Sequence, residues 1–351
     1  MKNFRIYTFL TFLFLWSTSG SAQSILELYF GGNKDSLRNE ATKLIHIPDP
    51  TFNPAVQMTE PDPATIAEMG FEQVYKSEHC SFTVRDNKKI FAYKFPNQSD
   101  NTIILIHGVG SSAYMYNKTA GLLQEATQAE VYTIDLRGHG QSDGISGDVD
   151  YINQYVDDLA DILNTIRKEK PNGKLIIAGH SMGGGVALRY GMEKQYEQPD
   201  GFLLFAPLIG HNSPAFPQGQ ATENTAEEPF MKIHIERIIG LKMLNEIDNH
   251  GYDSLPVLFF NLPETVPLRK YSYRANASMA PDDYVIGLKA VKKPMLVLIG
   301  SQDEAFSAEA LQNAVLDNST GEMKIIDGAS HNGVRYNAQS FTFINDWFSK
   351  I

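Results

Sequence analysis

The stretch that decides the fold is LIIAGHSMGG, residues 175–184, in which an apolar run leads directly into Gly-x-Ser-x-Gly. A helical pattern follows, and this order is typical of a sharp turn from a strand into a helix. Glycine on each side of Ser181 avoids side-chain clashes in so tight a turn and lets the helix approach the sheet. We therefore expect Ser181 at an exposed apex, where the helix N-terminus points backbone N–H groups at any oxyanion that forms there.

Short apolar runs recur on both sides of this turn, as expected of strands covered on both faces. They are 102–106, 131–135, 175–178, 202–205, 295–299 and 323–326. Helical patterns lie between most of them, at 114–126, 152–167 and 182–194. This alternation predicts an α/β fold with a doubly wound parallel sheet. Two further runs, 81–85 and 89–95, flank a polar turn and predict an antiparallel hairpin.

The remaining segments divide the chain. Residues 1–22 carry a short positive start, an apolar run and small residues before Gln23, and they predict a secretory signal peptide that is cleaved after Ala22. Export to the periplasm, the cell surface or the extracellular space would follow, and retention as an anchor is the alternative. Residues 23–76 form a Pro-rich arm that we expect to be irregular, apart from short helices, and to wrap the core. Residues 77–206 and 292–351 form the core, and 207–291, with apolar residues at helical spacing, are expected to be an inserted helical cap.

Composition excludes several classes of protein. Of the 351 residues, 42% are hydrophobic, which suits a globular chain. Lys and Arg total 30 against 41 Asp and Glu, and no basic run stands out, so nucleic acid is not an expected partner. The single cysteine, Cys80, excludes an intrachain disulfide framework and a Cys-rich zinc site. No motif with metal-ligand spacing occurs, and the sequence predicts neither a metal nor a cofactor.

A serine nucleophile needs a base and an orienting acid, which follow it in the chain in this architecture. His331 is the only histidine downstream of Asp303, and each of the two residues follows a predicted strand. Asp303 is the favoured acid because it lies in the turn after a buried strand. Asp327 and Glu304 are the alternatives: Asp327 stands at the end of its strand, where capping the turn is the plainer role, and Glu304 would need a shifted loop.

Two glycine-containing motifs follow the first strands of the core. In His107-Gly-Val-Gly110, glycines let the backbone come close to a bound carbonyl, so the N–H groups of Val109 and Met182 are the expected oxyanion donors. His107 precedes the nucleophile and is expected to orient this loop. The second motif, DLRGHGQS at 135–142, is interpreted as a polar network that holds a turn.

Together these motifs resemble the α/β-hydrolase superfamily. The residues that carry the resemblance are His107-Gly-x-Gly110, Asp135-Leu-Arg-Gly-His-Gly-x-Ser142, Gly179-His-Ser-Met-Gly-Gly184, Gly300-Ser-Gln-Asp303 and Gly328-Ala-Ser-His331. The set most resembles the monoacylglycerol lipase and lysophospholipase branch, in which serine aminopeptidases are also grouped, and it covers roughly residues 78–350. The resemblance implies a mostly parallel eight-stranded sheet with helices on both faces and a cap after the sixth strand. It also implies the same roles for the catalytic residues Ser181, Asp303 and His331 and for the oxyanion donors.

The expected function is that of an exported serine hydrolase that cleaves carboxylic esters through an acyl-enzyme. Acylglycerol-like or lysophospholipid-like esters come first, because an apolar cap over a serine site suits the burial of alkyl groups. A carbohydrate or other polar ester is the alternative, as is a proline-type aminopeptidase that binds a free amine through Glu223, Glu227 or Glu228. A non-catalytic binding protein is the least expected, since the Ser, Asp and His set is intact. Contact of the cap with a membrane surface and the oligomeric state stay open.

Overall fold

The computed structural model describes residues 24–53, 63–216 and 228–351. The predicted signal peptide, 1–22, lies outside these described residues. Among the helices of the described ranges, none combines the length and the apolar character that a membrane span requires.

Eight strands form one sheet, in the order β1-β2-β4-β3-β5-β6-β10-β11. The strands are β1 (Glu78–Thr83), β2 (Lys89–Phe95), β3 (Thr102–Ile106), β4 (Glu130–Ile134), β5 (Leu175–His180), β6 (Gly201–Phe205), β10 (Met295–Gly300) and β11 (Glu322–Ile326). Only β2 runs against the others in this sheet, since it pairs antiparallel with both β1 and β4 while the remaining pairs are parallel. The predicted α/β fold with a mostly parallel sheet is confirmed, and the six apolar runs correspond to β3, β4, β5, β6, β10 and β11.

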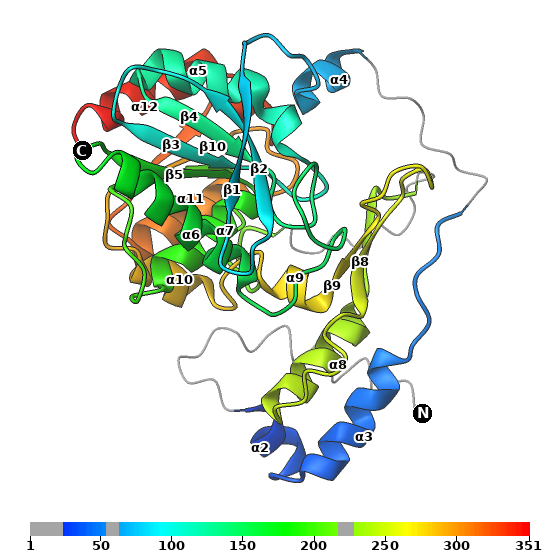
Figure 1. Cartoon of the computed structure of the whole chain (residues 1–351). Coiled ribbons are helices and arrows are strands. Elements are labelled where there is room, and N and C mark those ends of the chain that lie inside the picture. Colours follow the sequence, from blue (N-terminus) through cyan, green and yellow to red (C-terminus); the bar gives the residue numbers. More distant parts are fainter. Residues whose placement is uncertain (1–23, 54–62, 217–227) are drawn as a thin grey trace.

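Helices cover both faces of this sheet (Figure 1). On one side α5 (Asn117–Thr127) packs on α12 (Ala338–Phe348), and on the other α6 (Gln154–Glu169) packs on α7 (Met182–Met192). Two more helices, α10 (Tyr284–Ala290) and α11 (Ala308–Asn318), contact each other. The sheet is therefore buried on both faces, which is why its strands read as continuous apolar runs instead of alternating ones.

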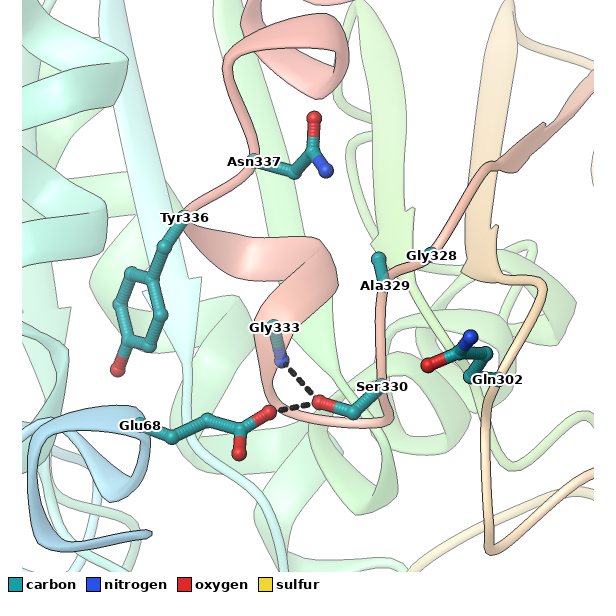
Figure 2. Close-up of a pocket in the computed structure, with 8 residues that line it drawn as sticks. All are labelled: Glu68, Gln302, Gly328, Ala329, Ser330, Gly333, Tyr336 and Asn337. Atoms are coloured by element: carbon teal, nitrogen blue, oxygen red, sulfur yellow. Dashed lines mark hydrogen bonds between the residues drawn. The ribbon is translucent and has the colours of Figure 1, made fainter. Parts of the chain in front are cut away.

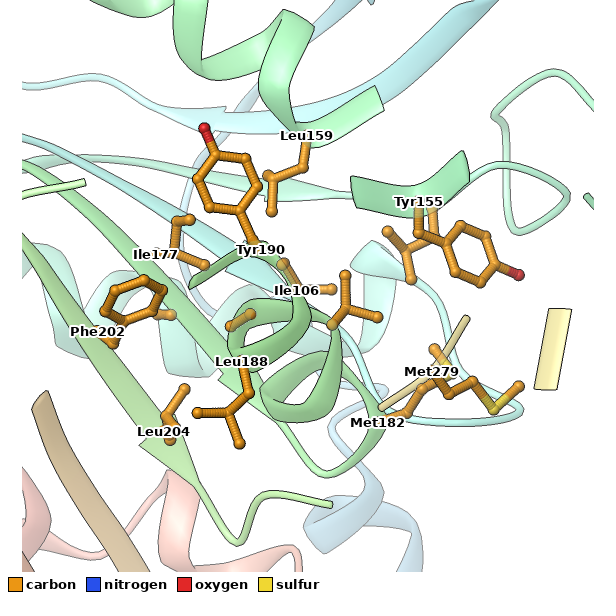
Figure 3. Close-up of a cluster of buried hydrophobic side chains, with 14 of the residues drawn as sticks. Ile106, Tyr155, Leu159, Ile177, Met182, Leu188, Tyr190, Phe202, Leu204 and Met279 are labelled. Atoms are coloured by element: carbon orange, nitrogen blue, oxygen red, sulfur yellow. The ribbon is translucent and has the colours of Figure 1, made fainter. Parts of the chain in front are cut away.

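The hydrophobic core lies between the central strands and the helices α6 and α7 (Figure 3). Ile106 of β3, Ile177 of β5 and Phe202 of β6 are fully buried, as are Leu159 of α6 and Leu188 of α7. Every residue of β3, β5 and β6 is buried. This packing fixes the carboxyl ends of the three strands relative to one another, and Val109 and Ser181 follow the ends of β3 and β5.

The segment between β6 and β10 differs from the predicted helical cap, because it also contains a second sheet. Strands β7 (Met231–Ile233), β8 (Pro256–Phe260) and β9 (Lys270–Ser272) pair antiparallel beside α8 (Ile235–Glu246) and α9 (Tyr273–Ala277). The apolar run of β8 is five residues long, too short for a helix of its own. Its proline stands at the first position of the strand, where the missing N–H is tolerated.

The arm is more regular than the sequence predicted, and its first part packs on the cap instead of the core. It forms α2 (Ile25–Phe30), α3 (Lys34–Ile45) and α4 (Pro63–Met69), and α3 lies against α8 (Figure 1). The prolines that suggested irregularity begin only after α3 ends. Within α3 the buried residues recur at helical spacing, at Leu37, Ala41, Leu44 and Ile45.

Gly240 of α8 permits the close contact between arm and cap. A Cβ added there would lie 2.9 Å from the carbonyl oxygen of Ala41 and 2.8 Å from the side chain of Ile45. A larger side chain would therefore force α3 away from α8. The N-terminus of α3 is capped by Asn33, whose side chain accepts a hydrogen bond from the Ser36 N–H at 2.9 Å.

Candidate active site

Ser181 occupies the turn between β5 and α7 that the sequence predicted. Its backbone has φ 52° and ψ −115°, a sparsely populated conformation for a residue with a side chain. The turn leaves no room beside it: a Cβ on Gly179 would lie 2.3 Å from the carbonyl carbon of Gly183, and one on Gly183 would lie 2.3 Å from the Ile106 carbonyl oxygen. Met182 begins the helix, so its N–H has no partner within α7. Ser181 is therefore held at the helix N-terminus, where an oxyanion would be stabilised.

The loops after β10 and β11 bring Asp303 and His331 together. The Oδ2 atom of Asp303 lies 2.9 Å from Nδ1 of His331, and the carboxyl group is fully buried. Its other oxygen, Oδ1, accepts hydrogen bonds from the N–H groups of Ala305 and Phe306, at 2.9 and 2.8 Å. These bonds fix the carboxylate, and the carboxylate fixes the orientation of the imidazole ring.

The two alternative acids do not face the imidazole ring. Glu304 accepts a hydrogen bond from the backbone N–H of His331, at 3.0 Å, and Asp327 lies 3.4 Å from the hydroxyl of Ser301. Of the three candidate carboxylates, the geometry therefore favours Asp303.

His331 reaches the serine turn through His180. The Nε2 atom of His180 lies 3.0 Å from the His331 carbonyl oxygen, and the two rings have their centroids 4.7 Å apart. Within the described ranges, no hydrogen bond joins the Ser181 hydroxyl to the His331 ring. Such bonds often form only when substrate is bound. The Asp303 and His331 pair thus lies beside the residue that precedes Ser181.

The loop of residues 107–110 lies against Ser181. A Cβ on Gly108 would be 3.5 Å from Cβ of Ser181. The Gly108 N–H donates to the Tyr116 hydroxyl at 2.8 Å, and the Gly110 N–H donates to the Tyr271 hydroxyl at 2.9 Å. Among the described residues, the N–H of Val109 between them has no acceptor. It is thus left available to a ligand, which is the role that the sequence predicted for it.

His107 orients the peptide group to which this N–H belongs. Its Nδ1 lies 2.9 Å from the Gly108 carbonyl oxygen, and its Nε2 accepts a hydrogen bond from the Leu136 N–H at 3.1 Å. Burial lowers the pKa of His107 to about 4, so the ring is neutral and its Nδ1 carries the proton. Because the Gly108 carbonyl and the Val109 N–H share one peptide plane, holding the carbonyl also aims the N–H.

The motif at 135–142 forms a polar network at the end of β4, in keeping with its interpretation from the sequence. Asp135 accepts hydrogen bonds from the N–H groups of Ala113 and Gln141, at 2.6 and 2.8 Å. Arg137 is buried and pairs with Asp158 at 2.7 Å. Burial raises the pKa of Asp135 and outweighs its two backbone N–H donors, which act in the opposite direction.

Aromatic side chains lie beside the 107–110 loop and beside His331. From the cap, the Phe260 ring would lie 3.6 Å from a Cβ on Gly110, and its centroid is 5.6 Å from that of Tyr271. From the loop after β10, the Phe306 ring packs edge-on against His331 with centroids 5.4 Å apart. These rings lower the local polarity around the predicted nucleophile.

Sequence analysis did not identify the contact between the arm and the His331 loop. Figure 2 shows Glu68 of α4 accepting a hydrogen bond from the Ser330 hydroxyl, which itself accepts one from the Gly333 N–H at 2.9 Å. A cavity of about 440 Å³ adjoins them, and its lining includes Gln302 and Tyr336 but neither Ser181 nor His331. The part of the arm that follows residue 62 thus supports the loop that carries the predicted base.

Two further points concern the amine site considered from the sequence and the groups that could hold a metal ion. Of the acidic residues considered for binding an amine, Glu223 and Glu227 lie outside the described residues, and Glu228 is already paired with Lys232 at 2.7 Å. In the ranges 24–53, 63–216 and 228–351, no cluster of His, Cys, Asp or Glu could hold a metal ion.

Known proteins resemble parts of this chain. Residues 97–252 match the family model described as serine aminopeptidase, S33. The monoglyceride lipase of Rattus norvegicus is 31% identical over 126 residues, which are 35% of this chain and 41% of that enzyme. A putative esterase/lipase of Mycoplasma pneumoniae is 26% identical over 274 residues, 75% of this chain and 94% of that protein. The matched stretch thus spans about two fifths of the length of the monoglyceride lipase.

Solved structures share the fold at low sequence identity. The α/β hydrolase GrgF from a Penicillium species is 18% identical, with a TM-score of 0.55 over 79% of this chain and 99% of that one. Its similarity supports the sheet architecture alone. The sheet order, the strand–Ser181–helix turn and these similarities show that the chain has the α/β-hydrolase fold and that part of it is similar to monoglyceride lipase and to the serine aminopeptidase family model.

Proposed function

We propose that this protein is an exported serine hydrolase that cleaves carboxylic esters through an acyl-enzyme intermediate. The observation that carries the proposal is the buried carboxylate of Asp303, 2.9 Å from Nδ1 of His331, in loops that lie beside the Ser181 turn. A carboxylate, an imidazole and a serine in this arrangement are the groups that acyl transfer requires. The α/β-hydrolase fold and the similarity of residues 97–252 to the serine aminopeptidase family model support the proposal.

In the first half of the reaction, Ser181 Oγ would attack the ester carbonyl carbon while Nε2 of His331 takes the hydroxyl proton. The carbonyl oxygen becomes an oxyanion, which the N–H groups of Val109 and Met182 would bind. Collapse of this intermediate breaks the bond to the alcohol, which leaves with the proton from His331. In the second half, water attacks the acyl-serine by the same route and releases the acid.

The proposed substrates are acylglycerol-like or lysophospholipid-like esters. Phe260 beside the 107–110 loop and Phe306 beside His331 supply apolar surface near the site, which supports an alkyl chain as part of the substrate. The similarity of the core to a monoglyceride lipase points the same way. A polar-ester esterase and a proline-type aminopeptidase are the alternatives that the test below separates.

Hydrolysis of p-nitrophenyl esters from acetyl to palmitoyl tests this function. We expect rates that peak at medium or long acyl chains and vanish in Ser181→Ala. Ser340→Ala is the matched control, because Ser340 is a buried serine of α12 outside the site. Activity confined to the acetyl ester would favour a polar ester, and release of N-terminal proline from peptides without esterase activity would favour the aminopeptidase. Turnover that survives Ser181→Ala would refute the mechanism.

We also propose that the protein is exported, on the strength of residues 1–22 alone. N-terminal sequencing of the protein made by its own cells should begin at Gln23. A chain found inside the cell that still begins at Met1 would contradict export.

A further inference from the structure

A tyrosine of the cap holds one end of the predicted oxyanion loop. Tyr271, in β9, is completely buried, and its hydroxyl oxygen accepts the hydrogen bond from the Gly110 N–H at 2.9 Å. The same oxygen lies 2.8 Å from Nε2 of His139, in the polar network after β4. One hydroxyl group therefore connects the cap to two loops of the core.

The direction of these hydrogen bonds follows from the environment of His139. Its Nδ1 lies 2.9 Å from the carbonyl oxygen of Arg137, which can only accept, so Nδ1 carries a proton. Burial lowers the pKa of His139 to about 3, so the ring is neutral and Nε2 is an acceptor. The Tyr271 hydroxyl must then donate to His139, which leaves its lone pairs to accept from Gly110.

A second tyrosine makes the same arrangement from within the core. The Tyr116 hydroxyl accepts from the Gly108 N–H and lies 2.8 Å from Nδ1 of His180. Tyr116 therefore holds the His107–Gly108 peptide group, and Tyr271 holds the Val109–Gly110 peptide group, so the two tyrosines hold the loop before and after the Val109 N–H. Tyr116 belongs to the core and stays with it, whereas Tyr271 belongs to the cap.

Of the two glycines that the tyrosine hydroxyls bind, Gly110 has the less rigid backbone. Its φ of 66° lies in the left-handed region, and glycine gives that backbone little intrinsic rigidity. The cap strand that holds it is in turn anchored to the core, since the Ser272 N–H donates to the Gly147 carbonyl at 3.0 Å and Arg274 pairs with Asp148 at 2.6 Å. Tyr271 can therefore reach Gly110 only while this root of the cap is docked.

We propose that Tyr271 is a positioning residue that orients the Val109 N–H through Gly110 and so makes oxyanion binding depend on docking of the cap. This inference rests on the proposed serine hydrolase function. An oxyanion donor contributes fully only when it is already aimed at the developing charge. Loss of the Tyr271 hydroxyl leaves the substrate-binding surfaces in place but leaves the Gly110 N–H unbound and the loop free to turn.

Tyr271→Phe tests the proposal, because it removes the hydroxyl and keeps the ring packed on Phe260. We expect kcat for the best p-nitrophenyl ester to fall roughly tenfold to a hundredfold, with KM held within about twofold, as for a lost transition-state contact. Binding of an alkyl boronic acid, whose tetrahedral adduct places an oxygen in the oxyanion hole, should weaken by the same factor. The matched control is Tyr273→Phe, another buried tyrosine of the cap, whose hydroxyl makes no hydrogen bond to the loop in the described part of the chain. Tyr273→Phe should leave both kcat and the affinity for the boronic acid unchanged.

The proposal would be overturned if Tyr271→Phe left kcat unchanged or raised KM alone. It would also be overturned if Tyr273→Phe lowered kcat as much as Tyr271→Phe does. Amide hydrogen exchange of Gly110 gives a readout that does not depend on turnover. We expect protection of this amide in the wild-type protein and faster exchange in Tyr271→Phe. If the wild type hydrolyses no ester, the proposed function fails. The exchange rates still show whether the Gly110 N–H is hydrogen-bonded to the Tyr271 hydroxyl. If the variant does not fold, an unprotected Gly110 amide in the wild type would by itself refute the role of Tyr271.

Discussion

At the scale of single residues, three side chains carry the proposed chemistry, and each stands where a strand of the sheet ends. Ser181 follows β5 with a left-handed φ of 52°, Asp303 follows β10, and His331 follows β11. The strained backbone at Ser181 persists because glycines 179 and 183 and the paired strands around it leave it no alternative. The three residues are therefore positioned by the strand ends at one edge of the sheet and not by a single loop.

Replacing the orienting acid should reduce turnover more than binding. Asp303→Asn keeps the size of the side chain but removes the charge that stabilises the imidazolium, so we expect kcat to fall about 10³-fold to 10⁴-fold with little change in KM. Steady-state kinetics on a p-nitrophenyl ester measure this loss. The matched control is Asp327→Asn, which should keep nearly full activity because Asp327 contacts Ser301 and not the His331 ring. The reverse result would make Asp327 the acid.

The sequence predicted the residues with local signals and missed those with long-range contacts. Ser181, Asp303 and His331 could be identified because each lies in a short motif directly after an apolar run. Tyr271 carries no such signal, since its partner Gly110 is 161 residues away. His180, which precedes Ser181, carries no local signal of a role, and only its contacts with Tyr116 and His331 show what it connects.

At the scale of secondary-structure elements, the arm and the cap form one packed unit. Arg237 of α8 is buried and donates hydrogen bonds to the carbonyl oxygens of Ile45, Ile47 and Pro256, and it pairs with Asp49 at 2.7 Å. Glu246, at the other end of α8, accepts hydrogen bonds from the first N–H groups of α2. The arm is therefore fastened along the whole length of the cap helix.

Removing the Arg237 guanidinium should loosen this unit. In Arg237→Met the apolar stem is kept while buried carbonyl groups lose their donors, and we expect the free energy of unfolding to fall by about 2–4 kcal/mol. Urea denaturation measures the loss, and limited proteolysis should cut within the arm first. The exposed ion pair of Arg38 with Asp35 provides the control, since Arg38→Ala should cost no more than about 1 kcal/mol. Equal stability of Arg237→Met and the wild type would show that the arm does not depend on this residue.

The helix α3 could have been predicted from the sequence, because its apolar residues keep helical spacing and Asn33 supplies a cap. The element on which α3 packs could not be predicted. Nothing in the sequence of residues 34–45 shows whether their apolar face packs on the cap helix α8 or on the core. The three strands of the cap were missed for a related reason: they are three to five residues long, and their apolar runs are equally compatible with a helical segment.

At the scale of the whole molecule, stability should depend on pH through its buried histidines. Burial lowers the pKa of His107 to about 4 and of His139 to about 3. In the unfolded chain both groups have a pKa near the ordinary histidine value of 6.5. Below that pH the unfolded state binds more protons than the folded state, so stability is complete above pH 6.5 and falls on acidification.

Between pH 7 and pH 5 each of these two histidines should cost the folded state about 2 kcal/mol. Asp135 and Asp158, whose pKa burial raises, take up protons in the folded state and oppose this loss only as the pH approaches their own range. Urea denaturation at the two pH values measures the difference. Equal midpoints and slopes at pH 7 and pH 5 would contradict the neutral, buried state of both rings.

The overall architecture followed from the sequence because a parallel sheet buried on both faces leaves continuous apolar runs, and all six of them became strands. The number of strands and the place of the inserted cap came from the resemblance to a known superfamily, whereas the order of the strands came from the structure. The course of the arm, from the cap to the loop of His331, depends on contacts between Glu68 and Ser330 that lie 262 residues apart. Packing of this kind is decided by the folded surface and not by local pattern.

The central claim is that Ser181 forms a covalent intermediate, and intact-protein mass spectrometry after reaction with a fluorophosphonate tests it most directly. The account predicts one adduct per chain, located on the peptide that contains Ser181 and absent from Ser181→Ala. Reaction should be much slower in His331→Ala, because the base is missing. An adduct on another residue, or no adduct on a folded protein, would contradict the account.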